Sequence, residues 1–254
     1  MWIAITRAVS PAINHCELTN LERLPIDLER ATAQHHAYEA ALRSLGVEVR
    51  SLPADPDLPD SVFVEDTAIV LDECAVLTRP GADSRKPETG SIARVLAPYR
   101  ELFRVQEPGT LDGGDALKID KTIYIGLSGR SDMSALGQVQ EFLAPFGYTV
   151  RGVPVRGCLH LKSAVTQVGE DVLILNPDWV DKASFPGLKF IEVDRSEPYA
   201  ANALWVGGTL IYQSVYPKTL TYLEAAGLDL LLVDQSELGK AEGALTCCSL
   251  IFKI

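Results

Sequence analysis

Hydrophobic and polar positions recur along this chain in a fixed order. Two short runs rich in apolar and β-branched residues are joined by a tight turn, and an amphipathic helical stretch and one more β-rich run follow them. The first unit has predicted strands over 67–71, 75–78 and 102–105 and a helix over 87–99; the second has strands over 116–119, 122–125 and 148–153 and a helix over 132–145. The pattern indicates internal repetition.

Three further units continue this order. The third has predicted strands over 163–168, 172–175 and 189–193 with a short helical piece near 178–182; the fourth has strands over 203–206, 209–213 and 228–233 with a helix over 217–226. The strand over 249–253 lacks partners unless it pairs with the strand over 2–6, whose helix (26–45) and strand (47–52) complete a fifth unit. The two ends of the chain are therefore expected to meet in one sheet.

Five such units predict a five-bladed α/β propeller with pseudo-fivefold symmetry, built as a single domain over residues 1–254. Radial repetition of small sheets limits exposed strand edges, and pairing the termini in one blade closes the ring. A doubly wound parallel sheet is the competing interpretation. That fold separates single strands by helices, whereas the strands here come in pairs. No low-complexity linker divides the chain, which favours one domain.

A short polar segment precedes the first strand of each unit. These segments are FVED (63–66), LDGGD (111–115), LHLK (159–162), EPYAAN (197–202) and LTCC (245–248). Equivalent positions in a ring of similar blades lie around one end of the central axis, so we expect the five segments to converge. Together they hold a thiol, an imidazole and several carboxylates, which are the groups that nucleophilic attack on a cationic carbon needs.

Cys247 and His160 are the candidate nucleophile and proton carrier. A lone cysteine is more often buried and inert, but Cys247 lies at a strand entrance beside the other polar segments. Its thiol attacks as thiolate and needs a cationic neighbour, which His160 or a cationic substrate supplies. His160 is the one histidine of four at a blade mouth, although a structural hydrogen-bonding role is the alternative. Cys248 is expected to point away, toward packing.

Carboxylates are present in two of the polar segments. Asp112 and Asp115 flank two glycines, a pattern that also suits a plain turn. Glu65 and Asp66 are adjacent acids inside an apolar run. Because burying an unpaired charge is unfavourable, solvent or a cationic ligand must meet at least one of them.

Two arginines lie in turns rich in glycine and serine. Arg85 is in GADSRK and Arg130 is in GLSGRSD. Exposed arginines in such turns are usually solubilising. As a pair beside a binding site, they would instead clamp a carboxylate.

Composition narrows the classes of partner. The formal net charge is −11 and the sequence pI is about 4.8, which disfavours nucleic acid and anionic membranes and weakly favours cationic ligands. No stretch reaches the roughly 18 apolar residues of a membrane span, and no signal peptide is evident. The five cysteines form no CxxC pair, so neither a disulfide framework nor a zinc ribbon is indicated. We expect a cytoplasmic protein with reduced thiols.

These segments resemble the guanidino-group-modifying enzymes of the pentein fold, and specifically the dimethylarginine dimethylaminohydrolase family. The resemblance covers nearly the whole chain. It rests on LPADPDLPDSVFVEDTAIV, LTRPGADSRK, LDGGDALK, IGLSGRSD, LHLKS and LTCCSLIF, which occur in the family's order and approximate spacing. Six ordered motifs make the resemblance specific.

The resemblance implies a role for each candidate residue. Cys247 would be the nucleophile, His160 the general acid and base, and Asp112 the carboxylate that binds the guanidinium and supports His160. The implied substrate-binding residues are Asp66 at the guanidinium, Asp60 and Glu65 nearer the amino acid end or in support of the pocket, Arg85 and Arg130 at the carboxylate, Leu18 in a mobile loop, and Ala241 through its main-chain oxygen.

The sequence departs from the family pattern at several positions. Ala241 and Glu242 stand where valine and aspartate are expected, and the segment around Leu18 is divergent. Arginine deiminases share LDGGD, but they are longer and typically carry an aspartate two residues after the histidine. This chain has Lys162 there.

The implied activity is hydrolysis of asymmetric dimethylarginine or monomethylarginine to citrulline and an amine, through a covalent intermediate on Cys247 and without metal or organic cofactor. The enzyme would thus be a hydrolase of carbon–nitrogen bonds in linear amidines, with a small cationic guanidino amino acid as its partner. Alternatives are a related hydrolase of arginine or another guanidine, and a catalytically silent guanidine-binding protein. Zinc on Cys247, His160 and Asp112 would be inhibitory. A homodimer is left open.

Overall fold

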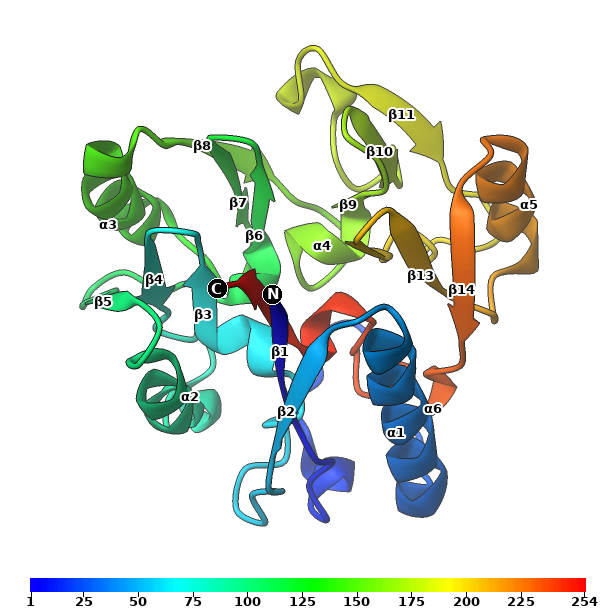
Figure 1. Ribbon diagram of the computed structural model, residues 1–254, viewed down its shortest axis with the longest axis horizontal. Helices are drawn as coiled ribbons and strands as arrows, with labels where there is room; N and C mark the ends of the chain where they lie inside the picture. The colour runs from blue at the N-terminus through cyan, green and yellow to red at the C-terminus, as the bar shows by residue number, and fades with distance from the viewer.

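The computed structural model describes residues 1–254 and contains five three-stranded sheets arranged around a central axis (Figure 1). Each sheet and its connecting segment form one blade. The strands, blade by blade, are β15 (Leu250–Lys253), β1 (Trp2–Arg7) and β2 (Glu48–Leu52); β3 (Ala68–Val70), β4 (Cys74–Leu77) and β5 (Glu101–Arg104); β6 (Ala116–Ile119), β7 (Thr122–Leu127) and β8 (Thr149–Pro154); β9 (Val165–Gln167), β10 (Val172–Leu175) and β11 (Lys189–Glu192); and β12 (Leu204–Val206), β13 (Thr209–Gln213) and β14 (Asp229–Val233). The predicted five-bladed α/β arrangement is confirmed.

Every blade has the same pairing. Its middle strand runs antiparallel to the first strand and parallel to the third. A parallel neighbour requires a crossover connection, which explains why the helical stretch always lies between the second and third strands of a unit. The crossover helices are α1 (Leu28–Ser44), α2 (Glu88–Leu96), α3 (Met133–Leu143) and α5 (Pro217–Ala225).

Local capping fixes where two of these helices begin. Asp27 accepts a hydrogen bond from the Arg30 amide at the start of α1, and Asp132 accepts one from the Ala135 amide at the start of α3. An aspartate side chain at this position satisfies an amide that has no partner within the helix. The capping aspartates therefore fix the first residues of α1 and α3 close to the helix starts that the hydrophobic periodicity predicts.

The β9–β11 blade differs from the prediction. Its connection contains no α-helix, and the helical piece expected near 178–182 is replaced by turns and a single 3-10 turn at Lys182–Ser184. Pro177 and Pro186 closely bracket the segment. Phe185 precedes Pro186 and lies outside the helical region, with φ −122° and ψ 67°, so it ends the 3-10 turn. Two more short helices, α4 (Leu161–Ala164) and α6 (Ser236–Gly239), were not predicted.

The hydrophobic core is divided among the seams between blades. One seam cluster joins Ile3 and Ile5 of β1 to Leu77 of β4, and another joins Tyr124 of β7 to Leu175 of β10. The remaining three clusters likewise draw their residues from two neighbouring blades. A three-stranded blade thus buries its faces only against its neighbours, which makes the ring the unit of stability.

The two ends of the chain meet within one sheet, as predicted. β1 pairs antiparallel with β15, and Trp2 lies opposite Lys253. Met1 and Ile254 also exchange backbone hydrogen bonds of 2.9 and 3.0 Å, and the N and C labels lie close together in Figure 1. This seam closes the ring. None of the helices combines the length and the apolar content that crossing a bilayer requires.

Candidate active site

Four of the polar segments fold as single helical turns directly before the first strand of a blade. They are the 3-10 turns η2 (Val64–Thr67), η4 (Gly113–Asp115) and η7 (Thr246–Cys248) and the short helix α4 (Leu161–Ala164). The strands that follow them, β3, β6, β15 and β9, are the innermost strands of their blades (Figure 1). The turns consequently meet at the axis, which confirms the predicted convergence.

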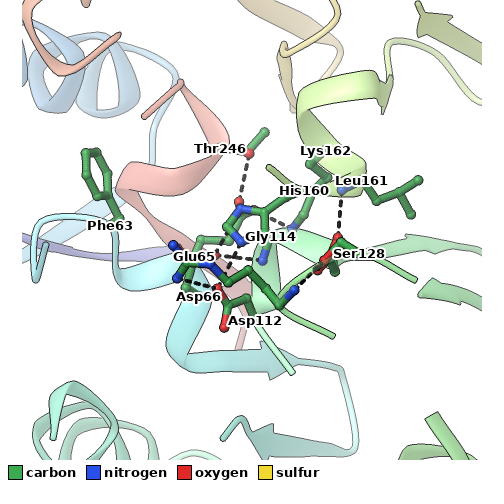
Figure 2. Close-up of polar contacts among 12 residues, drawn as sticks. Phe63, Glu65, Asp66, Asp112, Gly114, Ser128, His160, Leu161, Lys162 and Thr246 are labelled. Carbon is green, nitrogen blue, oxygen red and sulfur yellow. Dashed lines mark hydrogen bonds and ion pairs between the residues drawn. The ribbon is translucent and has the colours of Figure 1, made fainter. Parts of the chain in front are cut away.

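Hydrogen bonds join these turns to one another. The Gly114 amide donates to Asp66 Oδ1 at 2.9 Å, and the Leu161 amide donates to Asp115 Oδ1 at 2.8 Å. Thr246 Oγ1 donates to Glu65 Oε2 at 2.8 Å (Figure 2). The bonded carboxylates are all buried, so these contacts are shielded from water and hold the turns in a fixed arrangement.

A narrow pocket opens among the converged turns. The predicted site residues that line it are Asp60, Asp66, Arg85, Arg130, His160, Ala241 and Cys247. Lining residues that the sequence reasoning did not select are Glu17, Phe63, Leu159, Glu242 and Gly243. Leu18, Glu65 and Asp112, although expected at the substrate, do not line this pocket. The structure thus brings together a thiol, an imidazole, carboxylates and guanidinium groups from separate blades.

His160 and Asp112 form a buried pair. His160 Nε2 lies 2.9 Å from Asp112 Oδ2 (Figure 2). Asp112 also accepts a 2.8 Å bond from the Gly81 amide. Asp112 is fully buried behind the imidazole. The carboxylate therefore sets the orientation of the ring and stabilises its protonated form.

The two glycines between Asp112 and Asp115 are required by close packing. A Cβ atom on Gly114 would lie 2.6 Å from His160 Nδ1, and one on Gly113 would lie 2.0 Å from the carbonyl oxygen of Glu65. Neither distance is sterically allowed. The LDGGD segment is consequently more than a plain turn, because only glycine lets η4 approach both the imidazole and η2.

The electrostatic surroundings keep His160 protonated at neutral pH. Burial lowers the pKa of the imidazole, but Asp66, Asp112 and Asp115 outweigh burial and raise the pKa to about 9. For Asp66 the balance is the reverse: burial raises its pKa, whereas His160 and Arg85 lower it to about 2. An imidazolium and a carboxylate therefore face each other, with His160 Nδ1 3.8 Å from Asp66 Oδ1.

Cys247 remains a thiol in the unliganded protein. Its side chain is largely buried, and burial together with Glu65 and Asp66 raises the pKa of the thiol above its ordinary value. A cationic ligand against the same carboxylates would offset the negative potential and lower that pKa. Cys247 is thus arranged to ionise when a cation occupies the pocket.

The two arginines of the pocket have different bonding. Arg85 is nearly saturated, because Nε and Nη2 bond Glu88 at 3.0 and 2.8 Å and Nη1 bonds Asp66 Oδ2 at 2.5 Å. Arg130 donates from Nη2 to Thr19 Oγ1 at 3.1 Å, while its buried Nη1 has no hydrogen-bond partner. Nη1 also lies 3.7 Å from Asp112 Oδ2, an ion pair without a hydrogen bond. Because this nitrogen donates no hydrogen bond, Arg130 is the better donor for an incoming carboxylate.

Glu65 points away from the pocket that Asp66 lines. It forms an ion pair with Lys162 Nζ at 2.5 Å, and both residues line a separate cavity that runs along the first strands of all five blades. Adjacent residues of a 3-10 turn lie about 120° apart around its axis, so η2 presents Asp66 to one cavity and Glu65 to the other. The expectation that both acids belong to the substrate pocket therefore fits Asp66 alone.

Glu242 holds a loop of the N-terminal region beside the pocket through hydrogen bonds. The amides of residues 19–21 all donate to the Glu242 carboxylate, with distances of 2.9 Å from Thr19 and 2.8 Å from Leu21. Asp60 accepts a further bond from the Glu17 amide at 3.1 Å. Leu18 belongs to this loop, and its side chain is half-buried against the neighbouring core cluster. The departure from the family pattern at position 242 was the sequence signal for this contact.

Cys248 packs away from the pocket, as expected, but for a different reason. Cys247 and Cys248 belong to the 3-10 turn η7 and not to a strand. The Cys248 side chain is completely buried in a hydrophobic cluster and lies 3.5 Å from the Ala244 carbonyl oxygen. The direction follows from the rotation along the turn and not from the alternation of a strand.

One group of side chains has the geometry of a potential metal site. Asp66, Asp112 and His160 place a ligand atom each within 4.8 Å of one another. All three already have partners, because His160 bonds Asp112 and Asp66 bonds both Arg85 and Gly114. Cys247, which the zinc interpretation would use, is not part of this group.

Comparison with known proteins agrees with this geometry. A family model described as N,N dimethylarginine dimethylhydrolase, eukaryotic, matches residues 7–186. The N(G),N(G)-dimethylarginine dimethylaminohydrolase of Streptomyces coelicolor is 39% identical over 97% of this chain and 95% of its own length. The enzyme of the same name from Pseudomonas aeruginosa is 35% identical over 89% of this chain and 90% of its own length.

Solved structures give the same relation. A cysteine-to-serine variant of the Pseudomonas aeruginosa enzyme complexed with citrulline superposes with a TM-score of 0.94 at 32% identity and covers 98% of each chain. An adduct of a dimethylarginine dimethylaminohydrolase with S-methyl-L-thiocitrulline also gives a TM-score of 0.94 at 32% identity, covering 98% of this chain and 99% of the other. The fold is that of the penteins, and this chain belongs to the dimethylarginine dimethylaminohydrolase family.

Proposed function

We propose that this protein hydrolyses Nω-methylated arginines to citrulline and methylamine or dimethylamine, with Cys247 as the nucleophile. The observation that carries the proposal is the pocket itself, where a thiol and a protonated imidazole face an ionised carboxylate and an arginine with one nitrogen that donates no hydrogen bond. The binding of citrulline and of a thiocitrulline adduct by the similar solved enzymes supports it.

The first half of the reaction forms a bond to sulfur. Asp66 holds the planar guanidinium, whose positive charge lowers the pKa of the nearby Cys247 thiol, and the thiol releases its proton to solvent. The Cys247 thiolate adds to the guanidinium carbon and gives a neutral tetrahedral adduct. His160 then donates its proton to the methylated nitrogen, the carbon–nitrogen bond breaks, and the amine departs. An S-alkylthiouronium cation remains on Cys247, and His160 is neutral.

The second half releases citrulline. Neutral His160 takes a proton from a water molecule, and the resulting hydroxide adds to the thiouronium carbon. The carbon–sulfur bond breaks and returns the electron pair to sulfur, so the Cys247 thiolate is regenerated. The urea group of citrulline releases its extra proton to solvent, and His160 is again protonated. Asp112 is bonded to Nε2 and would hold the same imidazole orientation in both halves.

The remaining pocket residues fit the amino acid end of the substrate. We propose that Arg130 binds the α-carboxylate, while Asp60 and the Ala241 main-chain oxygen face the α-ammonium group. Asp60 lines the pocket, and Arg85 lowers its pKa against the larger effect of burial, which raises it. Arg85 itself holds Asp66 in place through the Nη1 bond. Leu18 would contact the substrate from the loop that Glu242 ties down.

The proposal is tested by measuring citrulline and amine release from asymmetric dimethylarginine, monomethylarginine, arginine and agmatine. We expect turnover of the two methylated arginines. Turnover of arginine alone would keep the mechanism but change the substrate class. If none of the four is hydrolysed although the protein still binds asymmetric dimethylarginine in a calorimetric titration, the protein is a guanidine-binding protein and the proposal fails.

Arg130→Ala is expected to raise KM for methylated arginines about 10- to 100-fold with a smaller change in kcat. A charge-assisted hydrogen bond contributes about 1.5–3 kcal/mol, which corresponds to that range. Steady-state kinetics with monomethylarginine measure the effect. Thr19→Val is the matched control, because it removes only the hydroxyl that Arg130 contacts in the loop. Equal KM values for the two variants would assign Arg130 to loop closure and not to the carboxylate.

We also propose a reducing, cytoplasmic environment for this enzyme. All five cysteines are free, including Cys247. A nucleophilic thiol must stay reduced to act, and cytosolic conditions keep it so.

A further inference from the structure

Asn202 ends the polar segment EPYAAN (197–202), which, like LDGGD, supplies no side chain to the pocket. It directly precedes Ala203 and the strand β12, and its side chain is 1% exposed. The pocket is lined from the N-terminal loop and from the segments around η2, Arg85, Arg130, His160 and Cys247. Judged by the lining residues alone, the segment before β12 would have no part in the site.

The Asn202 amide joins two of the other segments. Its Nδ2 donates to the Lys162 carbonyl oxygen at 2.9 Å and to Thr246 Oγ1 at 3.0 Å. Its Oδ1 accepts from the Thr246 amide at 3.1 Å. Both amide hydrogens and the carbonyl oxygen are used, so every hydrogen-bonding group of this buried side chain is satisfied.

These bonded residues are immediate neighbours of the reacting groups. Lys162 is two residues after His160 in α4, and Thr246 directly precedes Cys247 in η7. A single side chain thus connects the turn that carries the imidazole to the turn that carries the thiol. The Thr246 hydroxyl also links η7 to η2, because it accepts a hydrogen bond from Asn202 and donates one to Glu65.

We infer that Asn202 is a positioning residue for the hydrolysis, which sets the separation of Cys247 from His160 without touching the substrate; this rests on the proposed function. A reacting pair must be held closely, since a misplacement of about 1 Å lowers the rate by about 100-fold. No other side chain bonds both turns by hydrogen bonds to their backbones.

Only an amide meets this geometry. Aspartate at position 202 has no donor for the Lys162 carbonyl or for Thr246 Oγ1, and it adds a buried negative charge near Glu65. Alanine leaves the Thr246 amide and the Lys162 carbonyl without their partner. Both substitutions should loosen η7 against α4 while the pocket keeps all of its lining residues.

We expect Asn202→Ala to lower kcat for monomethylarginine about 10- to 100-fold and to leave KM within about threefold, because positioning affects the reacting atoms and not substrate binding. Asn176→Ala is the matched control. The side chain of Asn176 is also buried, donates to the Pro198 carbonyl at 3.0 Å and accepts from the Asp178 amide at 3.0 Å, but it bonds no segment of the pocket. Its backbone amide donates to the Ala164 carbonyl, and alanine keeps that bond. Thermal unfolding of both variants shows whether their losses of stability are comparable.

A second readout does not depend on turnover. The cationic reagent 2-chloroacetamidine should alkylate Cys247 in the wild type, and Asn202→Ala should slow that alkylation about tenfold, whereas Asn176→Ala should not. Mass spectrometry of the Cys247 peptide measures the rate. If Asn202→Ala does not fold, Thr246→Val removes the hydroxyl contact from the other side and should give the same pattern, with Thr246→Ser retaining wild-type rates.

The outcomes separate the inference from the proposed function. If the wild type hydrolyses methylated arginine and Asn202→Ala behaves like Asn176→Ala in both assays, the positioning role is wrong and the function stands. A wild type that neither hydrolyses the substrate nor reacts with 2-chloroacetamidine at Cys247 overturns both. The inference is supported if Asn202→Ala lowers both kcat and the alkylation rate while Asn176→Ala lowers neither.

Discussion

Cys247→Ala should release neither citrulline nor amine from methylated arginine, while its affinity for the substrate stays close to that of the wild type. The variant lacks the atom that bonds to the guanidinium carbon, so neither half of the reaction can begin. Asp66, Arg130 and the rest of the pocket lining are unchanged, so calorimetric titration with asymmetric dimethylarginine should still show binding. A colorimetric citrulline assay measures the loss of turnover.

The adjacent cysteine provides a matched control for this prediction. Cys248 is one residue away in the same 3-10 turn and is fully buried, but it does not line the pocket. Cys248→Ala should therefore keep turnover while losing some stability from the cavity that it leaves. Residual citrulline formation by Cys247→Ala above the uncatalysed rate would show that another group is the nucleophile.

The second large effect is expected from His160→Ala, which should lower kcat by about 100- to 10,000-fold, the range for loss of a positioned general acid and base. Both halves of the proposed reaction use this imidazole, first to protonate the amine and then to deprotonate water. His36→Ala is the control, since His36 is exposed on α1 and far from the polar segments in sequence. Turnover that survives His160→Ala at the wild-type rate would contradict the assignment.

The pH dependence of kcat/KM gives the same assignment a second test. His160 must carry its proton to act as the acid, and its pKa in the free protein is raised to about 9. Below about pH 9 His160 keeps its proton while the thiolate fraction of Cys247 grows with pH, so kcat/KM should rise up to about pH 9. Above that pH the loss of the imidazolium cancels the further gain of thiolate, because the pKa of Cys247 is also raised, and kcat/KM should level off. A rise that already levels off near the ordinary histidine pKa of about 6.5 would show that the carboxylates do not hold the proton on His160.

The ring of blades was predictable because each blade repeats the same short-range pattern. Paired strands such as β6 and β7 have clear turn residues between them, and the amphipathic stretch before β8 predicts α3 at nearly its observed place. The convergence of FVED, LDGGD, LHLK and LTCC followed from topology alone, since equivalent positions in a ring meet at the axis. The helical piece expected near 178–182 was wrong, because this segment forms turns and one 3-10 turn that ends at Phe185, the residue before Pro186.

Side-chain direction within the converged segments could not be predicted. Glu65 and Asp66 are adjacent and chemically alike, and only the rotation of η2 decides which cavity each acid faces. Arg85 looked equivalent to Arg130 in the sequence, yet Glu88 and Asp66 occupy most of its donors. Both outcomes depend on partners from other segments that meet only after folding, which is why a pattern along the chain does not contain them.

The seam between β15 and β1 has a consequence for how the chain could be cut and rejoined. Because Met1 and Ile254 already exchange backbone bonds, a short peptide linking residue 254 to residue 1 would disturb no contact of the ring. New ends opened at the exposed Gly207–Gly208 hairpin, where both residues have positive φ, would interrupt only a surface turn. In such a circular permutant Cys247 would lie nearer the beginning of the chain than its end, yet the turns η2, η4 and α4 would still surround it. The catalytic arrangement is therefore a property of the closed ring and not of the order in which its blades are joined.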